Sequence, residues 1–393
     1  MPSELKVNKL SPYTGTTLTL GDSGDTVSTD AVVQASQFVG GGLNAYRNLI
    51  INGDMQIAQR STSVTGITTS GYYTIDRFLT TESTGGVYTQ SQSTDVPTGQ
   101  GFSYSLKMET TTADTMTTTE SLRIGPRLEG QNLQLLKFGT SNAESLTLSF
   151  WVKSNKTGDY VARLLNINSG TDRQVTGVYT INSANTWEKK TFTFAGDTTG
   201  SFDNDNEDGL RLEMILAAGP DLTSGTQPTV WSNNNGVDSM VGQTVNIADT
   251  IGNTWYITGL QLEVGTSASD FEFLPYDVNL KRCQRYYQRI QGNASDQVAI
   301  GTGYADATGA LRYYHHLYTT MRAEPSVSEN DLASLGRATQ VADINIIQTF
   351  DESTETVGLD IVAASGTPYT TFDVQMIRLN TNADAYLEFD AEL

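Results

Sequence analysis

The stretch WYITGLQLEVGTSASDFEFLPYDVNLKRCQRYYQRI, residues 255–290, decides how the rest of the chain is organised. Its first third alternates strictly, which predicts a strand with two different faces. One face carries Tyr256, Thr258, Leu260, Leu262 and Val264, and the other carries Ile257, Gly259, Gln261 and Glu263. A Gly-Thr-Ser turn and Leu274-Pro275 then interrupt regular structure. After Asp277, which we expect to cap a helix, one helical turn and a further strand follow. The stretch therefore closes one β domain and begins another.

The composition predicts many short strands joined by turns. The 393 residues include 36 glycines and only 9 prolines, and Thr, Ser, Asn and Asp separate short apolar runs. This is typical of an all-β protein, and the length favours two or three domains. We expect residues 48–277 to form a central jelly-roll β-sandwich of about ten strands. Residues 278–393 should form a smaller C-terminal β-sandwich.

Residues 1–47 differ from the rest of the chain. Their short strands alternate threonine with leucine but carry too few apolar residues to build a private core. Such strands suit an interface between copies of the chain, as in the stalk of a homotrimeric fibre. A flexible arm with transient β structure explains the composition equally well. The glycine triplet at 40–42 is predicted to be a hinge.

The charge balance limits the partners. Lys and Arg total 24 against 44 acidic residues, a net charge of −20. So acidic a chain repels phosphate backbones and anionic lipid head groups, so we expect no nucleic-acid partner. No run approaches the roughly 20 apolar residues of a membrane span, so we expect no membrane insertion. The opening MPSELKVNKLS lacks an apolar segment, which predicts synthesis in the cytoplasm without classical export.

The residues that commonly carry catalysis are scarce. Cys283 is the only cysteine, so the chain has no internal disulfide, and we expect a structural, inert thiol. His315 and His316 are adjacent, which on a strand points them to opposite faces. No nucleophile elbow is present, and no pair among the acids is singled out for glycoside cleavage. We therefore predict no catalytic residues.

Several motifs occur in an order that resembles a known family. They are NLIINGDMQIAQR (48–60), DRF (76–78), SLTLSFWVKS (145–154), the TFTF strand after Trp187, GLRLEMILAAG (209–219) and the opening stretch. Together they resemble the carbohydrate-binding-type jelly roll of fibre and other virion structural proteins of tailed bacteriophages, especially those of marine hosts. SELKVNKLSPYTGTTLTLGDSGDTVST (3–29) resembles the stalks of such fibres, and MRAEPSV (321–327) and AYLEFDAEL (385–393) resemble their C-terminal domain.

The resemblance implies a homotrimeric tail fibre or similar virion appendage, assembled in the host cytoplasm. Its N-terminal segment would contact other virion proteins, and it would attach to host-surface polysaccharide or lipopolysaccharide without cleaving it. Two alternatives stay open. One is a purely structural capsid or tail decoration protein without sugar binding, and the other is a polysaccharide depolymerase.

Aromatic side chains are the candidates for sugar contact, because the C–H faces of pyranose rings stack on Trp and Tyr. Trp151 is opposite in parity to Leu148 and Phe150, so it should face outward or into a cleft. Trp231 sits in a loop rich in Ser and Asn, and Tyr304 and Tyr313 belong to C-terminal strands. Ordinary packing is the alternative for each of them.

We expect no required cofactor, with a structural calcium ion as one option. The resemblance implies such an ion near the first and last strands of the jelly roll, where Asp54 and Glu263 are the candidate ligands. The acidic run 203–209 has its glycine seventh rather than sixth, so a solvated hairpin tip is favoured there over a calcium loop.

Overall fold

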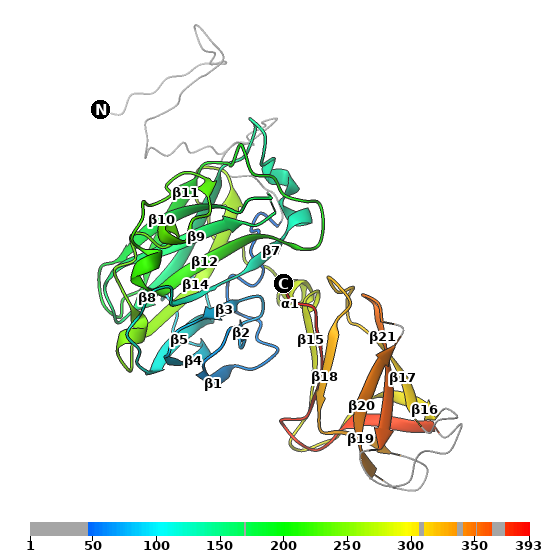
Figure 1. Ribbon diagram of the computed structural model, residues 1–393. Helices are drawn as coiled ribbons and strands as arrows, with labels where there is room; N and C mark the ends of the chain where they lie inside the picture. Colours follow the sequence, from blue (N-terminus) through cyan, green and yellow to red (C-terminus); the bar gives the residue numbers. More distant parts are fainter. Residues whose placement is uncertain (1–45, 169, 306–309, 336–340, 351, 364–373) are drawn as a thin grey trace, which may run out of the picture. The chain divides into compact units, whose positions relative to one another are not determined.

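The computed structural model describes residues 46–393 apart from 169, 306–309, 336–340, 351 and 364–373 (Figure 1). Residues 44–393 form one compact unit. The expected stalk, its trimer interface and the hinge at 40–42 lie outside the described residues, except for residues 46 and 47. Among the described helices, none is long and apolar enough to span a membrane.

Two antiparallel sheets enclose the larger core (Figure 1). The first has six strands in the order β1 (Ser63–Ile67), β4 (Val87–Ser93), β5 (Ser105–Thr112), β14 (Thr254–Val264), β8 (Leu146–Ser154) and β11 (Glu188–Phe194). The second has eight, in the order β13 (Ser232–Asn233), β10 (Arg173–Ile181), β9 (Gly158–Asn166), β12 (Asp208–Ala218), β6 (Ser121–Gly125), β3 (Leu79–Glu82) and β2 (Gly71–Tyr72), with β7 (Arg127–Glu129) also paired to β12. Short 3₁₀ segments lie at Gly130–Leu136, Pro220–Leu222, Gly236–Asp238 and Ile247–Asp249.

The order of these strands confirms the jelly roll. One sheet contains β5-β14-β8-β11 and the other contains β6-β12-β9-β10. If these eight strands are numbered 1 to 8 along the chain, the first sheet has the order 1-8-3-6 and the second has the order 2-7-4-5. This arrangement is the double Greek key of a jelly roll. The core lies between the sheets, and Trp255 is among its largest fully buried side chains.

The predicted faces of β14 are wrong at its start. Trp255 and Ile257 pack in the core together with Leu260 and Leu262, so Tyr256 lies on the outer face. The pairing of β14 with β8 shifts register between Thr258 and Gln261, where Gly259 has φ +63°. This β-bulge adds one residue and exchanges the two faces. A Cβ at Gly259 would lie 2.5 Å from the Phe102 ring, so glycine is required there.

In residues 48–57, the shared parity of Leu49, Ile51, Met55 and Ile57 predicts one regular run, with Gly53 at a bulge or a close approach. The residues do not form that run. They form turns held by asparagine side chains: Asn52, with φ +62°, bonds the backbone N–H and C=O of Ile57. Ile50 is buried where the pattern placed Ile51. The expected close approach at Gly53 is confirmed, because a Cβ there would lie 2.1 Å from the carbonyl oxygen of Leu260.

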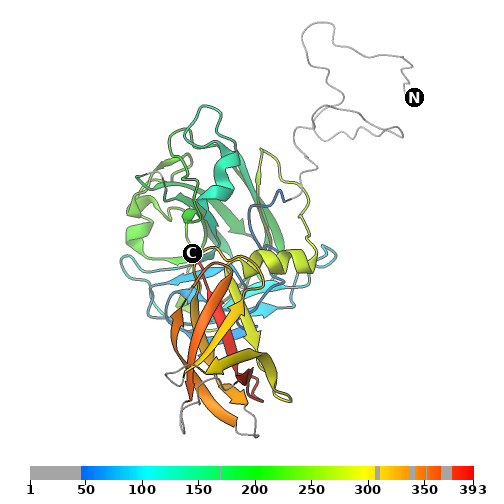
Figure 2. The ribbon, with the colours of Figure 1, turned by 90° about the vertical axis from the view of Figure 1, so that its right-hand side faces the viewer.

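The C-terminal part begins with helix α1 (Tyr276–Gln284), which is visible in yellow in Figure 2. Pro275 takes the N-cap position that the sequence assigned to Asp277, and Asp277 lies in the first turn. A three-stranded sheet follows, in the order β15 (Tyr287–Gln291), β23 (Tyr386–Asp390) and β18 (Ser326–Asn330). Cys283 is fully buried on α1, and burial raises the pKa of its thiol well above the ordinary value, as a structural thiol requires.

The remaining strands close into a barrel, where the sequence predicted a second sandwich. Its order is β16 (Val298–Ala305), β17 (Leu311–His316), β21 (Thr356–Ala363), β20 (Val341–Phe350), β19 (Leu332–Leu335) and β22 (Val374–Leu379). The barrel closes because β16 pairs with both β17 and β22. Barrels and sandwiches share the same inward-outward alternation, so the pattern alone does not distinguish them. The all-β class is confirmed.

His315 makes the C-terminal core sensitive to acid. Its ring stacks on Phe389 with centroids 4.7 Å apart, and its Nδ1 lies 3.0 Å from the Tyr313 hydroxyl. Burial lowers the pKa of His315 to about 4, and the neighbouring His316 adds to that shift. The folded state therefore favours neutral imidazole.

We expect His315 to destabilise the fold between pH 6.5 and 4. In this window the unfolded chain binds a proton that the folded chain excludes, so stability is full above pH 6.5 and falls by roughly 3 kcal/mol towards pH 4. Thermal melting of the full chain at pH 7 and pH 4.5 measures this loss. His315→Phe should reduce it, whereas the matched change His316→Phe should not. An equal loss in all three proteins would contradict the assignment.

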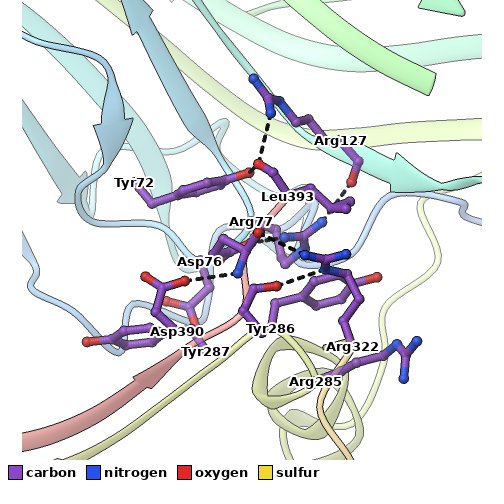
Figure 3. Close-up of polar contacts among 12 residues, drawn as sticks. Tyr72, Asp76, Arg77, Arg127, Arg285, Tyr286, Tyr287, Arg322, Asp390 and Leu393 are labelled. Atoms are coloured by element: carbon purple, nitrogen blue, oxygen red, sulfur yellow. Dashed lines mark hydrogen bonds and ion pairs between the residues drawn. The ribbon is translucent and has the colours of Figure 1, made fainter. Parts of the chain in front are cut away.

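A junction of arginine, tyrosine and acidic side chains joins the jelly roll to the C-terminal strands (Figure 3). Arg77 pairs with Glu392, donates to the carbonyl of Arg127 at 2.7 Å and lies 3.4 Å from the Tyr286 ring centroid. Arg60 repeats this arrangement: it pairs with Asp390 at 2.8 Å and lies over the Tyr287 ring.

Two further contacts complete the junction. Arg285 donates two hydrogen bonds of 2.8 Å to the buried carboxylate of Glu129. Arg322 donates to the carbonyl of Asn206 at 2.9 Å, so the acidic run 203–209 contacts the C-terminal part. Hydrogen bonds and ion pairs thus connect the two cores at several separate points.

Candidate functional site

Three aromatic side chains gather on the outer face of the six-stranded sheet. Trp151 on β8 and Tyr256 on β14 lie on the opposite side from the core residues of their strands, and Trp187 immediately precedes β11. The rings of Trp187 and Tyr256 meet edge to face, with centroids 6.2 Å apart. All three side chains are partly exposed. We call this group the aromatic face.

Charged side chains surround Tyr256 on this face. The ammonium group of Lys153 lies 4.4 Å from the Tyr256 ring centroid and 5.3 Å from that of Trp187. Lys107 lies 5.8 Å from the same Tyr256 centroid and pairs with Glu109 at 2.5 Å. The rings are thus flanked by hydrogen-bond donors and acceptors.

Asp95 fixes the arrangement from a loop. It accepts a hydrogen bond of 3.0 Å from the indole N–H of Trp187 and pairs with Lys153. Burial would raise the pKa of Asp95, but the hydrogen bonds from Lys153 and Trp187 outweigh it and hold this pKa below its ordinary value. Asp95 is therefore ionised at neutral pH, and the Trp187 ring is held in place.

Trp151 extends the face along the sheet. It lies between Lys189 on β11 and Thr258 on β14 in the strand register. Beyond Thr258, the bulge at Gly259 lies under Phe102, whose ring contacts Phe271 and the exposed Phe273.

The other predicted contact residues lie elsewhere. Trp231 packs edge-on against Phe138, and its indole N–H donates to the carbonyl of Ala195 at 2.8 Å. Tyr313 is buried in the barrel, where burial raises its pKa to about 12. Tyr304 is 45% exposed on β16. The structure therefore brings none of these three together with Trp151.

Asp54 and Glu263 take separate partners. Asp54 accepts from the Asn279 side chain at 3.1 Å, and burial raises its pKa. Glu263 accepts from the N–H and hydroxyl of Ser269 at 2.8 and 2.6 Å. Within the described residues, no group of three or more His, Cys, Asp or Glu side chains is placed to hold a metal ion.

Sequence reasoning missed Tyr256 and Trp187 as surface aromatics. Strict alternation assigned Tyr256 to the face of Leu260, because the bulge at Gly259 was not counted. A glycine inside a strand pattern is a signal of such a bulge and could have corrected the assignment. Trp187 has no such signal, since it precedes its strand and meets Tyr256 only through the pairing of β11, β8 and β14.

Comparisons with known proteins give only weak likenesses. No family model matches the sequence. No curated protein sequence matches it. Solved structures that match include tailspike protein 4 of bacteriophage CBA120 (its enzymatically active domain), at 12% identity and a TM-score of 0.30 over 56% of this chain and 22% of that one. The chain thus spans about a fifth of that domain.

Two other matches cover almost the whole of the similar chain. A family 11 carbohydrate-binding module of a Clostridium thermocellum cellulase has 9% identity and a TM-score of 0.27, over 52% of this chain and 98% of that one. A putative sugar binding protein from Bacteroides thetaiotaomicron has 12% identity and a TM-score of 0.30, over 55% and 99%. These scores are too low to indicate a function.

Proposed function

We propose that the chain binds saccharides on the aromatic face. The observation that carries this proposal is the gathering of Trp151, Trp187 and Tyr256 outside the core, on one sheet face and next to charged donors and acceptors. Aromatic rings offer an apolar surface to the C–H face of a sugar, and lysine and carboxylate groups bind its hydroxyls. A sheet positions such groups more rigidly than a loop does.

The chemistry of the aromatic face favours binding of a glycan without its cleavage. A glycosidase needs a carboxyl group with a raised pKa as its proton donor. The hydrogen bonds that hold the pKa of Asp95 low make it an ionised partner of Lys153 instead. Asp95 therefore supports orientation of the rings rather than proton transfer to a leaving group.

In the context of the sequence motifs, this binding would serve attachment of a phage particle to a host-surface polysaccharide or lipopolysaccharide. A trimeric fibre would present three copies of the face. Individually weak sites would then together bind the particle firmly to the host surface. The fibre role and the trimer belong to the same proposal. Labelling of the protein on the virion tests the fibre role, and light scattering tests the trimer.

The test of function uses the full chain on an array of host-surface polysaccharides and lipopolysaccharides, followed by an assay for new reducing ends on each bound glycan. We expect saturable binding and no new reducing ends. Absence of binding across the array would favour the decoration protein. Release of new reducing ends would favour the depolymerase.

A further inference from the structure

Four arginines lie on the outer face of the eight-stranded sheet, on the side opposite to the aromatic face. Strand register places Arg163 on β9 beside Glu213 on β12, and Arg127 on β7 beside Arg211 on β12. Arg123 on β6 stands opposite Ile215 of the same central strand. The arginine face is defined here as Arg123, Arg127, Arg163 and Arg211 with the acids Asp208 and Glu213.

The charge of this face is opposite to that of the chain. Four guanidinium groups against two carboxylates leave a local excess of positive charge, while the whole chain carries −20. The negative field of an acidic chain stabilises cationic groups, and each of the four arginines pairs with Asp208 or Glu213. Because two carboxylates serve four guanidinium groups, part of the positive charge of this face is available to a bound anion.

Part of the face is fixed and part is free to bind. Arg163 is locked, since it pairs with Glu213 at 2.6 Å and donates to Gln174 at 3.2 Å. Among the residues that the structure describes, Arg123 donates one hydrogen bond, to Glu213 at 3.1 Å, and Arg211 donates one, to Asp208 at 2.7 Å. A guanidinium carries five N–H donors, so Arg123 and Arg211 retain unused donors. Their side chains are 24% and 29% exposed.

Three of the arginines line a shallow hollow. Its walls include Arg123, Arg127 and Arg211 together with Thr81 and Glu213, and it is open to solvent. Burial would raise the pKa of Glu213, but the charges of Arg163 and Arg123 outweigh it and hold this pKa below its ordinary value. Glu213 stays ionised and orients its arginine neighbours before any ligand arrives.

We propose that the arginine face is a second saccharide site, selective for sugars that carry carboxylate or sulfate groups. The planar guanidinium fork matches both groups with two parallel hydrogen bonds. A single carboxylate or sulfate group of a saccharide suits the small hollow, whereas a long polyphosphate chain would meet the repulsion of the surrounding acidic surface. This site is independent of the aromatic face and of its proposed function.

The experiment titrates the full chain with tetragalacturonate, with its neutral methyl ester and with a sulfated tetrasaccharide, by calorimetry in 50 mM salt. At least one acidic probe should bind, and the methyl ester should bind at least tenfold more weakly. Binding should weaken further in 500 mM salt. If neither acidic probe binds, or the ester binds equally well, the proposal is overturned.

Single substitutions test whether acidic saccharides bind at the arginine face. Arg123→Gln and Arg211→Gln should each weaken acidic binding at least tenfold, with melting temperatures close to the parent because both side chains are partly exposed. Lys137→Gln removes the same charge from an exposed pair with Glu144 and should change nothing. Trp187→Ala should also leave acidic binding intact, which separates this site from the aromatic face. Equal affinity in the arginine variants would overturn the proposal.

Discussion

Replacing Arg77 with methionine is expected to lower the free energy of unfolding by roughly 3–5 kcal/mol. Arg77 is 1% exposed, and its guanidinium is held by Glu392, by the carbonyl of Arg127 and by the face of Tyr286. Methionine fills a similar volume but leaves the Glu392 carboxylate, itself almost buried, with only its longer pair to Arg60 at 3.4 Å. The cost arises from the loss of the closer pair and of the hydrogen bond to the Arg127 carbonyl rather than from lost packing.

Denaturant unfolding of the full chain measures this effect, with two comparisons. Lys137→Met breaks an ion pair that is largely exposed, so it should change stability far less. Adding Glu392→Gln to Arg77→Met removes the carboxylate that has lost its closer cation and should recover part of the loss. If Arg77→Met is no more harmful than Lys137→Met, the junction does not hold the two cores together.

Replacing Trp187 or Tyr256 with alanine should each weaken binding of the glycan identified on the array by at least tenfold, about 1.4 kcal/mol. Each change removes one ring from the pair that meets at 6.2 Å, and truncation of a central aromatic anchor is among the most costly changes at a binding surface. Trp187→Ala also leaves Asp95 without one of its hydrogen-bond donors.

Two matched changes serve as controls for these variants. Tyr256→Phe keeps the ring and should retain most of the affinity. Tyr304→Ala removes an aromatic side chain that is 45% exposed on the barrel, and it should bind as the parent does. If Tyr304→Ala abolished binding and the Trp187 variant did not, recognition would belong to the C-terminal barrel.

The sequence predicted the regular parts of the fold because long alternation defines a strand and both of its faces. Alternation predicts strands at 145–153 and 174–181, and β8 and β10 begin and end within one residue of these bounds. The helical turn followed by a strand after Asp277 is confirmed. Strands β18 and β19 were not predicted, because segments of five and four residues carry little periodic signal.

The site was only partly predictable because its parts meet through tertiary structure. Trp151 could be placed outside the core from parity alone, and this is confirmed. Asp95 reaches Lys153 from a loop 58 residues earlier, which no local pattern indicates. The arginine face likewise depends on the register of β9, β12, β6 and β7.

The motifs behind the family resemblance are mostly architectural. Asp76-Arg77-Phe78, the segment around Tyr286 and the last residues before 393 meet at the junction, and MRAEPSV supplies Arg322 to it (Figure 3). Residues that hold two cores together must match the geometry of the contact between them. This explains why these motifs indicate an architecture and leave the ligand open.

The most direct test of the aromatic face uses the four tryptophans as reporters. Two of them, Trp151 and Trp187, lie on the face, whereas Trp231 packs against Phe138 and Trp255 is fully buried in the core. The measurement is a titration of ¹⁵N-labelled full chain with the glycan identified on the array, following the four indole N–H signals by NMR. We predict saturable shifts of the Trp151 and Trp187 signals, with the Trp231 and Trp255 signals unmoved. Saturable binding that leaves Trp151 and Trp187 unmoved would contradict the account.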